Sequence, residues 1–128
     1  MKTGEFIYAK THADFLNKAF GTRYKAWMKC SWRYDEQWIV WMVRFNKKDG
    51  GWTNTFVTES RIMQKNLNEV KVYEGIPIAQ ATTKKRIVFE IDDSGDEKKY
   101  VFRGKFVYDE INSNPITSQF LDKVADEF

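Results

Sequence analysis

Apolar and polar residues alternate through much of the chain with the two-residue period of a β-strand. Between residues 24 and 34 the even positions are mainly apolar and the odd positions mainly cationic, which predicts a half-buried strand. A central strand covered on both sides is indicated by WIVWMVRF (38–45), which is apolar on both faces. The next strand is expected in WTNTFVT (52–58), after the turn NKKDGG (46–51), whose Asp-Gly pair tolerates positive φ angles.

The clearest hairpin is predicted in the second half of the chain. Its strands are KRIVFEI (85–91) and KKYVFRGKFVYDE (98–110), and the acidic segment DDSGDE (92–97) suits an exposed turn. In the second strand, Gly104 indicates a bulge or a close backbone approach. One aromatic face is expected on this strand, made of Tyr100, Phe102, Phe106 and Tyr108.

Helical spacing is present in three segments. The first is THADFLNKAFG (11–21), in which Thr11 can cap the helix and Gly21 can end it. The others are a short helix within 59–70 and an amphipathic helix from Asn114 to the end of the sequence. Residues 5–10 are expected to form a short strand, and residues 70–83 a brief extended piece and a loop.

These elements predict an α+β fold dominated by β-structure. We expect a strongly bent antiparallel sheet or a small barrel of about five to seven strands, with short helices at its N-terminal and C-terminal ends. The length of 128 residues, the apolar share of 42% and the charged share of 30% fit one folded domain, residues 1–128.

The cysteine count and the length of the apolar runs indicate the cellular location. The single cysteine, Cys30, excludes an internal disulfide and a cysteine-based metal site, and its strand position predicts a small buried side chain. The first residues contain no apolar run long enough for a signal peptide, and no segment approaches 18 apolar residues. The expected location is therefore the cytoplasm, without a membrane partner.

Catalytic signatures are weak in this sequence. His12 is the only histidine and is expected on the surface of a helix, so neither a Cys–His pair nor a catalytic triad is indicated. No glycine-rich phosphate loop is present. We predict no catalytic residue, no metal site and no cofactor. One minority hypothesis is a metal-dependent nuclease that uses Glu90, Asp92 and Lys99, although these residues flank a predicted hairpin tip.

Two predicted strands have cationic faces. Lys25, Lys29 and Arg33 share a face with Trp27, and Arg103 and Lys105 share another, beside the strand that begins with Lys85 and Arg86. If the two faces adjoin, cations would bind phosphates while an aromatic ring stacks on a base. The net charge of +3 is compatible with such a partner, DNA or RNA, but does not require it.

A family resemblance supports nucleic-acid binding. The series GWTNTFVTES, KKRIVFEI and YVFRGKFVYD, within residues 51–109, resembles small β-rich modules found beside HNH and GIY-YIG nucleases in bacterial proteins. Those modules are similar to the PUA-like and SRA-like folds, which accept modified or flipped bases in an aromatic pocket. The resemblance implies that Trp52 and Asn54 contact a base and that Arg86 and Arg103 contact the backbone. No nuclease domain accompanies the module in this sequence.

The leading hypothesis is a non-enzymatic nucleic-acid-binding module of a prokaryotic or phage defence system, possessing a site for a modified or flipped base. Its predicted contacts are Lys25, Trp27, Lys29, Arg33, Trp52, Asn54, Arg86, Arg103 and Lys105. The alternative is a protein-interaction domain, an inhibitor or a homodimer, which would use the same aromatic residues as interface anchors.

Overall fold

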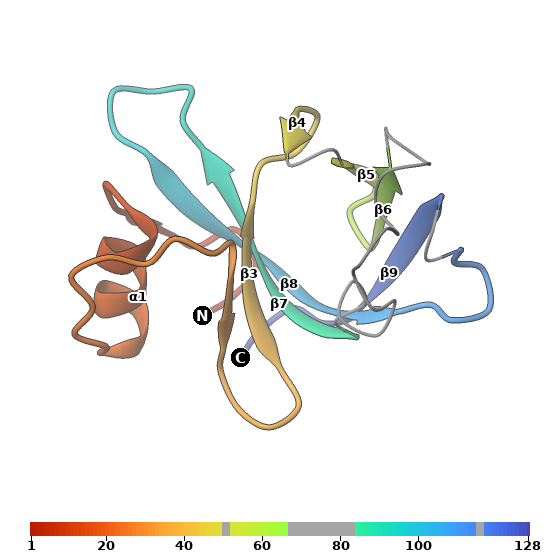
Figure 1. Cartoon of the computed structure of the whole chain (residues 1–128), viewed down its shortest axis with the longest axis horizontal. Helices are drawn as coiled ribbons and strands as arrows, with labels where there is room; N and C mark the ends of the chain where they lie inside the picture. The colour runs from red at the N-terminus through yellow and green to blue at the C-terminus, as the bar shows by residue number, and fades with distance from the viewer. Residues whose placement is uncertain (50–51, 67–83, 115–116) are drawn as a thin grey trace.

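The computed structural model describes residues 1–49, 52–66, 84–114 and 117–128. Within these residues the chain forms short and long β-strands and a single α-helix (Figure 1). In chain order the elements are β1 (Phe6–Tyr8), α1 (His12–Phe20), β2 (Ser31–Arg33), β3 (Ile39–Val43), β4 (Lys48–Asp49), β5 (Trp52–Thr58), β6 (Arg61–Asn66), β7 (Lys85–Asp92), β8 (Lys99–Tyr108) and β9 (Ser118–Ala125).

The strands form one strongly bent sheet. Its order is β2-β3-β7-β8-β9-β6-β5-β4, and β1 pairs with β8 off this path. All neighbours are antiparallel except β3 and β7, which run parallel. In the described part of the chain β2 and β4 are free edges, so the sheet is open and the expected barrel is not closed.

Curvature nevertheless brings distant strands together. Figure 1 shows the sheet curling from β3 through β8 and β9 to β5 and β6. Asn46, just after β3, donates its N–H to the carbonyl of Asn54 in β5 at 2.8 Å. The rings of Phe45 and Phe56 stack with centroids 4.2 Å apart. The concave side of the sheet is therefore enclosed, and we call it the inner face.

Two hydrophobic clusters lie on opposite sides of the sheet. The outer cluster packs α1 against the convex face, and the ring of Phe15 stacks on Tyr100 at 4.4 Å. Each large apolar side chain that is fully buried in this way stabilises the fold by about 1.5–3 kcal/mol. The outer cluster contains Ala9, Phe15, Leu16, Val40, Met42, Ile87, Phe89, Ile91, Tyr100 and Phe102. The inner cluster contains Trp41, Val43, Phe45, Ile62, Val88, Phe106 and Leu121.

Gly104 divides β8 between these clusters. The ladder to β7 shifts register between Val88 and Phe89, opposite Gly104, whose φ is +123°. This confirms the bulge expected at the mid-strand glycine. It also corrects the expectation of one aromatic face, because the extra residue reverses the side chains that follow. As a result Tyr100 and Phe102 join the outer cluster, while Phe106 belongs to the inner cluster and Tyr108 packs against it.

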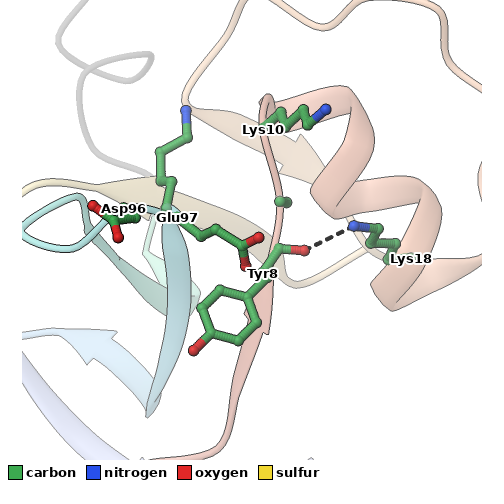
Figure 2. A pocket seen from close by; sticks show the side chains of 7 residues that line it. Tyr8, Lys10, Lys18, Asp96 and Glu97 are labelled. Atoms are coloured by element: carbon green, nitrogen blue, oxygen red, sulfur yellow. Dashed lines mark hydrogen bonds between the residues drawn. The ribbon is translucent and has the colours of Figure 1, made fainter.

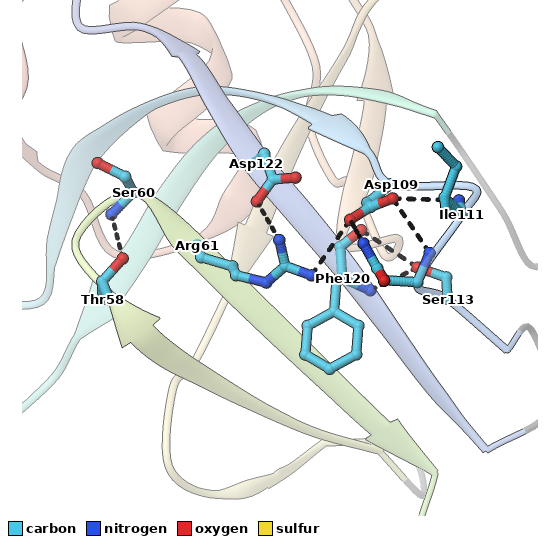
Figure 3. A network of polar contacts seen from close by, with 9 residues as sticks. Thr58, Ser60, Arg61, Asp109, Ile111, Ser113, Phe120 and Asp122 are labelled. Carbon is cyan, nitrogen blue, oxygen red and sulfur yellow. Dashed lines mark hydrogen bonds and ion pairs between the residues drawn. The ribbon is translucent and has the colours of Figure 1, made fainter.

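A polar network fixes β6 against β9 and the end of β8 (Figure 3). Arg61 pairs with Asp122 at 2.8 Å and with Asp109 at 3.2 Å, and its guanidinium lies 4.5 Å from the centroid of the Phe120 ring. Hydrogen bonds from Asn112, and then from Arg61 and Ile111, lower the pKa of Asp109. The carboxylate is thus ionised at neutral pH and ties the turn after β8 to the sheet.

Several predicted elements are confirmed. Thr11 caps α1 by accepting the N–H of Asp14, and Gly21 ends the helix with φ at +71°. The short strand near residue 6, the buried central strand, the strand at residues 52–58 and the β7–β8 hairpin all form as expected. No described helix has the length and apolar character needed to cross a membrane.

Other predicted elements are wrong. The helices expected within 59–70 and after Asn114 are the strands β6 and β9 where they are described. Hydrogen bonding across three strands outweighs the weak helical spacing, since β6 pairs with both β5 and β9. Residues 70–83 lie outside the described residues.

The predicted strand over residues 24–34 is also shorter than expected. It is confined to Ser31–Arg33, and the segment before it covers the outer cluster as a loop. Its even positions therefore do not share a buried face: Met28 is 92% exposed, and Cys30 is exposed rather than buried.

Candidate functional site

Buried polar side chains gather on the inner face of the sheet. The ladder places Asn54 of β5 opposite Gln64 of β6, and Gln64 opposite Gln119 of β9. Two residues along the same ladder, Trp52 is opposite Asn66. Because most buried positions in a domain are apolar, this concentration of amides needs a functional or structural reason. The buried polar residues are Asn54, Asn66, Arg86 and Gln119.

Arg86 spans the inner face. It lies on β7, yet its Nη1 donates to Oε1 of Gln64 on β6 at 3.2 Å, and its guanidinium lies 4.5 Å from the centroid of the Trp41 ring. The side chain is only 3% exposed, and desolvation lowers its pKa to about 10. Arg86 is therefore still protonated at neutral pH. It differs from the expected surface cation, because its charge is held inside the curved sheet.

Asn54 has an unused acceptor. Its side chain is 2% exposed, and its Oδ1 has no hydrogen-bond partner among the described residues. Leaving a buried acceptor unpaired costs about 1–3 kcal/mol. Such a cost is tolerated where a ligand supplies the missing donor, so Asn54 is the strongest candidate for a ligand contact on the inner face.

A cavity of about 400 Å³ lies further along the inner face. The stacked rings of Phe45 and Phe56 form part of its wall, and Asn54 is not among the residues that line it. Glu90 and Arg103, on the neighbouring strands β7 and β8, form an ion pair in its wall. Arg103, predicted as a nucleic-acid contact, is thus placed on the inner face.

A second cavity, of about 350 Å³, lies on the α1 side of the molecule (Figure 2). Its wall is fixed by Lys18, whose Nζ donates to the carbonyl of Tyr8 at 2.9 Å. Lys10, between β1 and α1, and Lys18 of α1 lie opposite Asp96 and Glu97 of the turn between β7 and β8, and Lys98 of that turn also lines the cavity. Cations and carboxylates are thus mixed in this lining, and none of the buried amides of the inner face belongs to it.

The predicted cationic faces are not formed as expected. Lys25 and Lys29 are exposed in the loop before β2, and only Arg33 of that set lies on a strand. Arg103 and Lys105 flank the bulge and face opposite sides of the sheet, because Arg103 lies over Phe56 and Lys105 over Trp38. The alternation rule failed where Gly104 inserts an extra residue.

Trp27, expected among exposed cations, is half-buried. Its ring packs on the outer cluster, and its Nε1 donates to the carbonyl of Ser31 at 3.2 Å. The combination of aromatic ring and cations occurs instead at Trp38. The Nζ atoms of Lys105 and Lys85 lie 4.0 Å and 5.7 Å from the centroid of its ring.

The residues proposed for a nuclease have structural contacts. Glu90 pairs with Arg103, and Asp92 accepts hydrogen bonds from the N–H and hydroxyl of Ser94, which lower its pKa. The Nζ of Lys99 lies 4.9 Å from the centroid of the Phe6 ring. Among the described residues, no three His, Cys, Asp or Glu side chains are grouped to hold a metal ion.

Sequence reasoning missed part of the buried polar group. Gln64, Asn66 and Gln119 lie in segments that were predicted as helices. Their location on one face of a sheet was therefore not predicted. A two-residue period was present in Ile62, Gln64 and Asn66, and the structure shows these three side chains following one another along β6. Trp41 was expected in the core, and its contact with Arg86 was not foreseen.

Comparison with known proteins identifies the kind of domain. The sequence pattern of the SRA domain, the SET and RING associated domain, matches residues 1–128. No curated protein matches the chain. Among solved structures, it is similar to the 5-hydroxymethylcytosine-specific restriction enzyme AbaSI, with a TM-score of 0.74 and 22% identity. The match covers 98% of this chain and 40% of that enzyme, so the shared feature is the fold of one part of a longer protein.

Proposed function

We propose that this chain, which belongs to the SRA domain family, binds DNA and accepts on its inner face a modified base rotated out of the duplex. The observation that supports this most directly is the buried Oδ1 of Asn54, which has no partner among the described residues. The similarity to an enzyme specific for 5-hydroxymethylcytosine suggests that the base is a modified cytosine.

The chemistry of cytosine fits this acceptor. Its exocyclic amino group is a hydrogen-bond donor, and Oδ1 of Asn54 accepts. Trp52 lies two residues earlier on β5, so its side chain is on the same side of the strand as Asn54. An indole ring at this position can stack on the face of the base while the amide contacts its edge.

Exposed cations would hold the DNA backbone. Lys25, Lys29 and Arg33 are exposed before and within β2, and Arg33 is paired in the ladder with Ile39, which packs against the inner cluster. Phosphate contacts of this kind position the duplex but do not read its sequence. We therefore assign affinity to these cations and base selectivity to the inner face.

Recognition without cleavage is the role that we propose for this module. Its setting would be the cytoplasm of a bacterium or a phage-infected cell, in a system that distinguishes modified from unmodified DNA. Incubation of the chain with modified plasmid and magnesium tests this part. Nicking that is lost in Asp92→Ala would replace recognition by catalysis as the proposed activity.

The binding proposal is tested with duplexes that differ at one cytosine. Fluorescence anisotropy with cytosine, 5-methylcytosine or 5-hydroxymethylcytosine at that position should show at least about tenfold tighter binding to a modified duplex. Asn54→Ala should abolish this preference while changing the free energy of unfolding by less than about 1 kcal/mol, since it removes an unpaired acceptor.

Thr55→Ala is the matched control, because Thr55 is the next residue of β5 and faces the other side of the strand. It should keep the preference. Equal binding of all duplexes by the unchanged chain, or a preference that survives Asn54→Ala, would refute the site.

A protein partner is the second candidate, and one observation favours it. Phe6 and Tyr8 are each 45% exposed on β1, where their rings contact each other at 5.2 Å. Exposed aromatic residues on a short strand are typical anchors of interfaces. If this surface mediates a homodimer, light scattering should show a dimer that Phe6→Ser converts to a monomer.

A further inference from the structure

The cavity at Glu90 and Arg103 has features of a separate ligand site. It has a volume of about 400 Å³, within the range of small-molecule pockets. Its wall combines the stacked aromatic rings of Phe45 and Phe56 with polar and charged side chains, among them Glu90 and Arg103. The lining comes from the segment after β3 and from β5, β7, β8 and β9, and β5 is far from β7 in the sheet order, so the curvature of the sheet creates the cavity.

The ion pair in this cavity is one-sided. Both Nε and Nη2 of Arg103 donate to the same oxygen of Glu90, Oε1, at 2.8 and 2.5 Å. The second carboxylate oxygen, Oε2, and the remaining guanidinium nitrogen, Nη1, make no hydrogen bond among the described residues. A bidentate pair would use both oxygens. One acceptor of Glu90 and one donor of Arg103 are thus left for a ligand.

The charges around the cavity disfavour an anionic ligand. Arg103 is neutralised by Glu90, Lys123 pairs with Asp126 at 3.0 Å, and Glu59 adds a further carboxylate to the lining. A phosphate would meet the Glu90 carboxylate and be repelled by it. A neutral molecule that offers a donor beside an acceptor would satisfy both unused atoms without a net charge.

Aromatic contacts indicate a flat ligand. The guanidinium of Arg103 lies 5.8 Å from the centroid of the Phe56 ring, and Phe56 is stacked on Phe45. Planar groups are favoured beside such rings because offset stacking adds to the burial of apolar area. The ion pair that carries the unused donor and acceptor therefore lies beside this aromatic wall.

We propose that this cavity is a second nucleobase site, separate from Asn54, for a base with an N–H beside a carbonyl. The N–H donates to Oε2 of Glu90, and the carbonyl accepts from Nη1 of Arg103. Guanine, hypoxanthine, thymine and uracil all present this pair of groups on their pairing edge. The proposal does not require that the inner face bind a modified cytosine.

The test uses free nucleosides, so that no DNA backbone contributes to binding. The whole chain, labelled with nitrogen-15, is titrated by NMR with inosine and with 1-methylinosine, which lacks the N–H. Inosine should bind at least about tenfold more tightly, because the methyl group removes the donor to Glu90. The shifted resonances should include the amides of Phe56 and Arg103.

Variants of the pair provide the second measurement. Glu90→Gln and Arg103→Met should each weaken inosine binding at least about tenfold. Glu110→Gln is the matched control, because Glu110 makes an exposed ion pair with Lys84 outside the cavity. It should bind inosine like the unchanged chain. If a cavity variant fails to fold, the comparison of inosine with 1-methylinosine on the unchanged chain decides alone.

The outcomes separate this site from the one at Asn54. Equal binding of the two nucleosides, no binding of either, or inosine binding that survives both cavity substitutions would refute the second site. Selective binding of a modified duplex could still persist in those cases. In contrast, inosine binding that is unaffected by Asn54→Ala is the expected result, even if no duplex is preferred.

Discussion

At the scale of single residues, Gly104 determines which side of the sheet the residues of β8 face. Its φ of +123° is in a region that side chains with a Cβ rarely adopt, and a Cβ there would lie 3.0 Å from the carbonyl oxygen of Ala125. Glycine therefore allows both the backbone angle and the close approach of β9. The bulge then directs Arg103 into the inner face and Lys105 to the outer one.

We expect Gly104→Ala to lower the free energy of unfolding by about 1–3 kcal/mol, because both the φ angle and the contact with β9 become unfavourable. Urea denaturation measures the difference. Gly95→Ala is the control, since its Cβ would meet nothing nearer than an oxygen 4.0 Å away, and it should change stability by less than about 0.5 kcal/mol. Equal effects of the two substitutions would show that Gly104 is not strained.

At the scale of elements, local signals identified α1 and the β7–β8 hairpin. The cap residues of α1 and the alternation along β7 and β8 act within a few residues, so the sequence alone reveals them. For β6, the residues Ile62, Met63 and Asn66 fit a helical face and a strand almost equally well. Pairing with β5 and β9 makes this segment a strand. That pairing joins residues far apart in the sequence, so a short stretch of sequence does not reveal it.

The candidate site was foreseen only in part for the same reason. Trp52 and Asn54 were predicted from a family resemblance. The amides of β6 and β9 could have been predicted only if these segments had been recognised as strands. Arg86 was identified as a cation, but its burial depends on curvature that brings Gln64 within 3.2 Å. Curvature of this kind is a property of the assembled sheet.

The cap of α1 gives a prediction for this element. Thr11 accepts the N–H of Asp14 at 3.0 Å, so Thr11→Ala should destabilise the chain by about 1 kcal/mol. Thr11→Ser keeps the hydroxyl and should cost much less. Thermal unfolding followed by circular dichroism measures both. Indistinguishable melting temperatures for the two variants would argue against a stabilising cap.

At the scale of the whole molecule, a net charge of +3 makes the placement of cations more important than their number. The exposed residues near β2 are the candidates for phosphate contacts, whereas Arg86 and Arg103 face inward. Affinity and base selectivity should therefore depend on salt to different extents, because only the phosphate contacts release counterions.

We expect Lys25→Ala, Lys29→Ala and Arg33→Ala each to reduce the slope of log K against log salt by up to about 1, while the preference for a modified duplex is retained. Lys10→Ala is the control, because Lys10 lines the cavity on the α1 side. Anisotropy titrations at several salt concentrations measure the slopes. Unchanged slopes in all three variants would place the DNA on another surface.

The division of β8 at Gly104 also has a consequence for cooperativity. Since one continuous strand supplies residues to both clusters, neither cluster can open fully without separating β8 from its neighbours. Amide hydrogens of residues 100–106 should therefore exchange with solvent only through global unfolding. Ligand bound on the inner face should then slow exchange at Phe102, although Phe102 packs on the opposite side of the sheet. Hydrogen exchange would thus detect binding from the far side of the molecule.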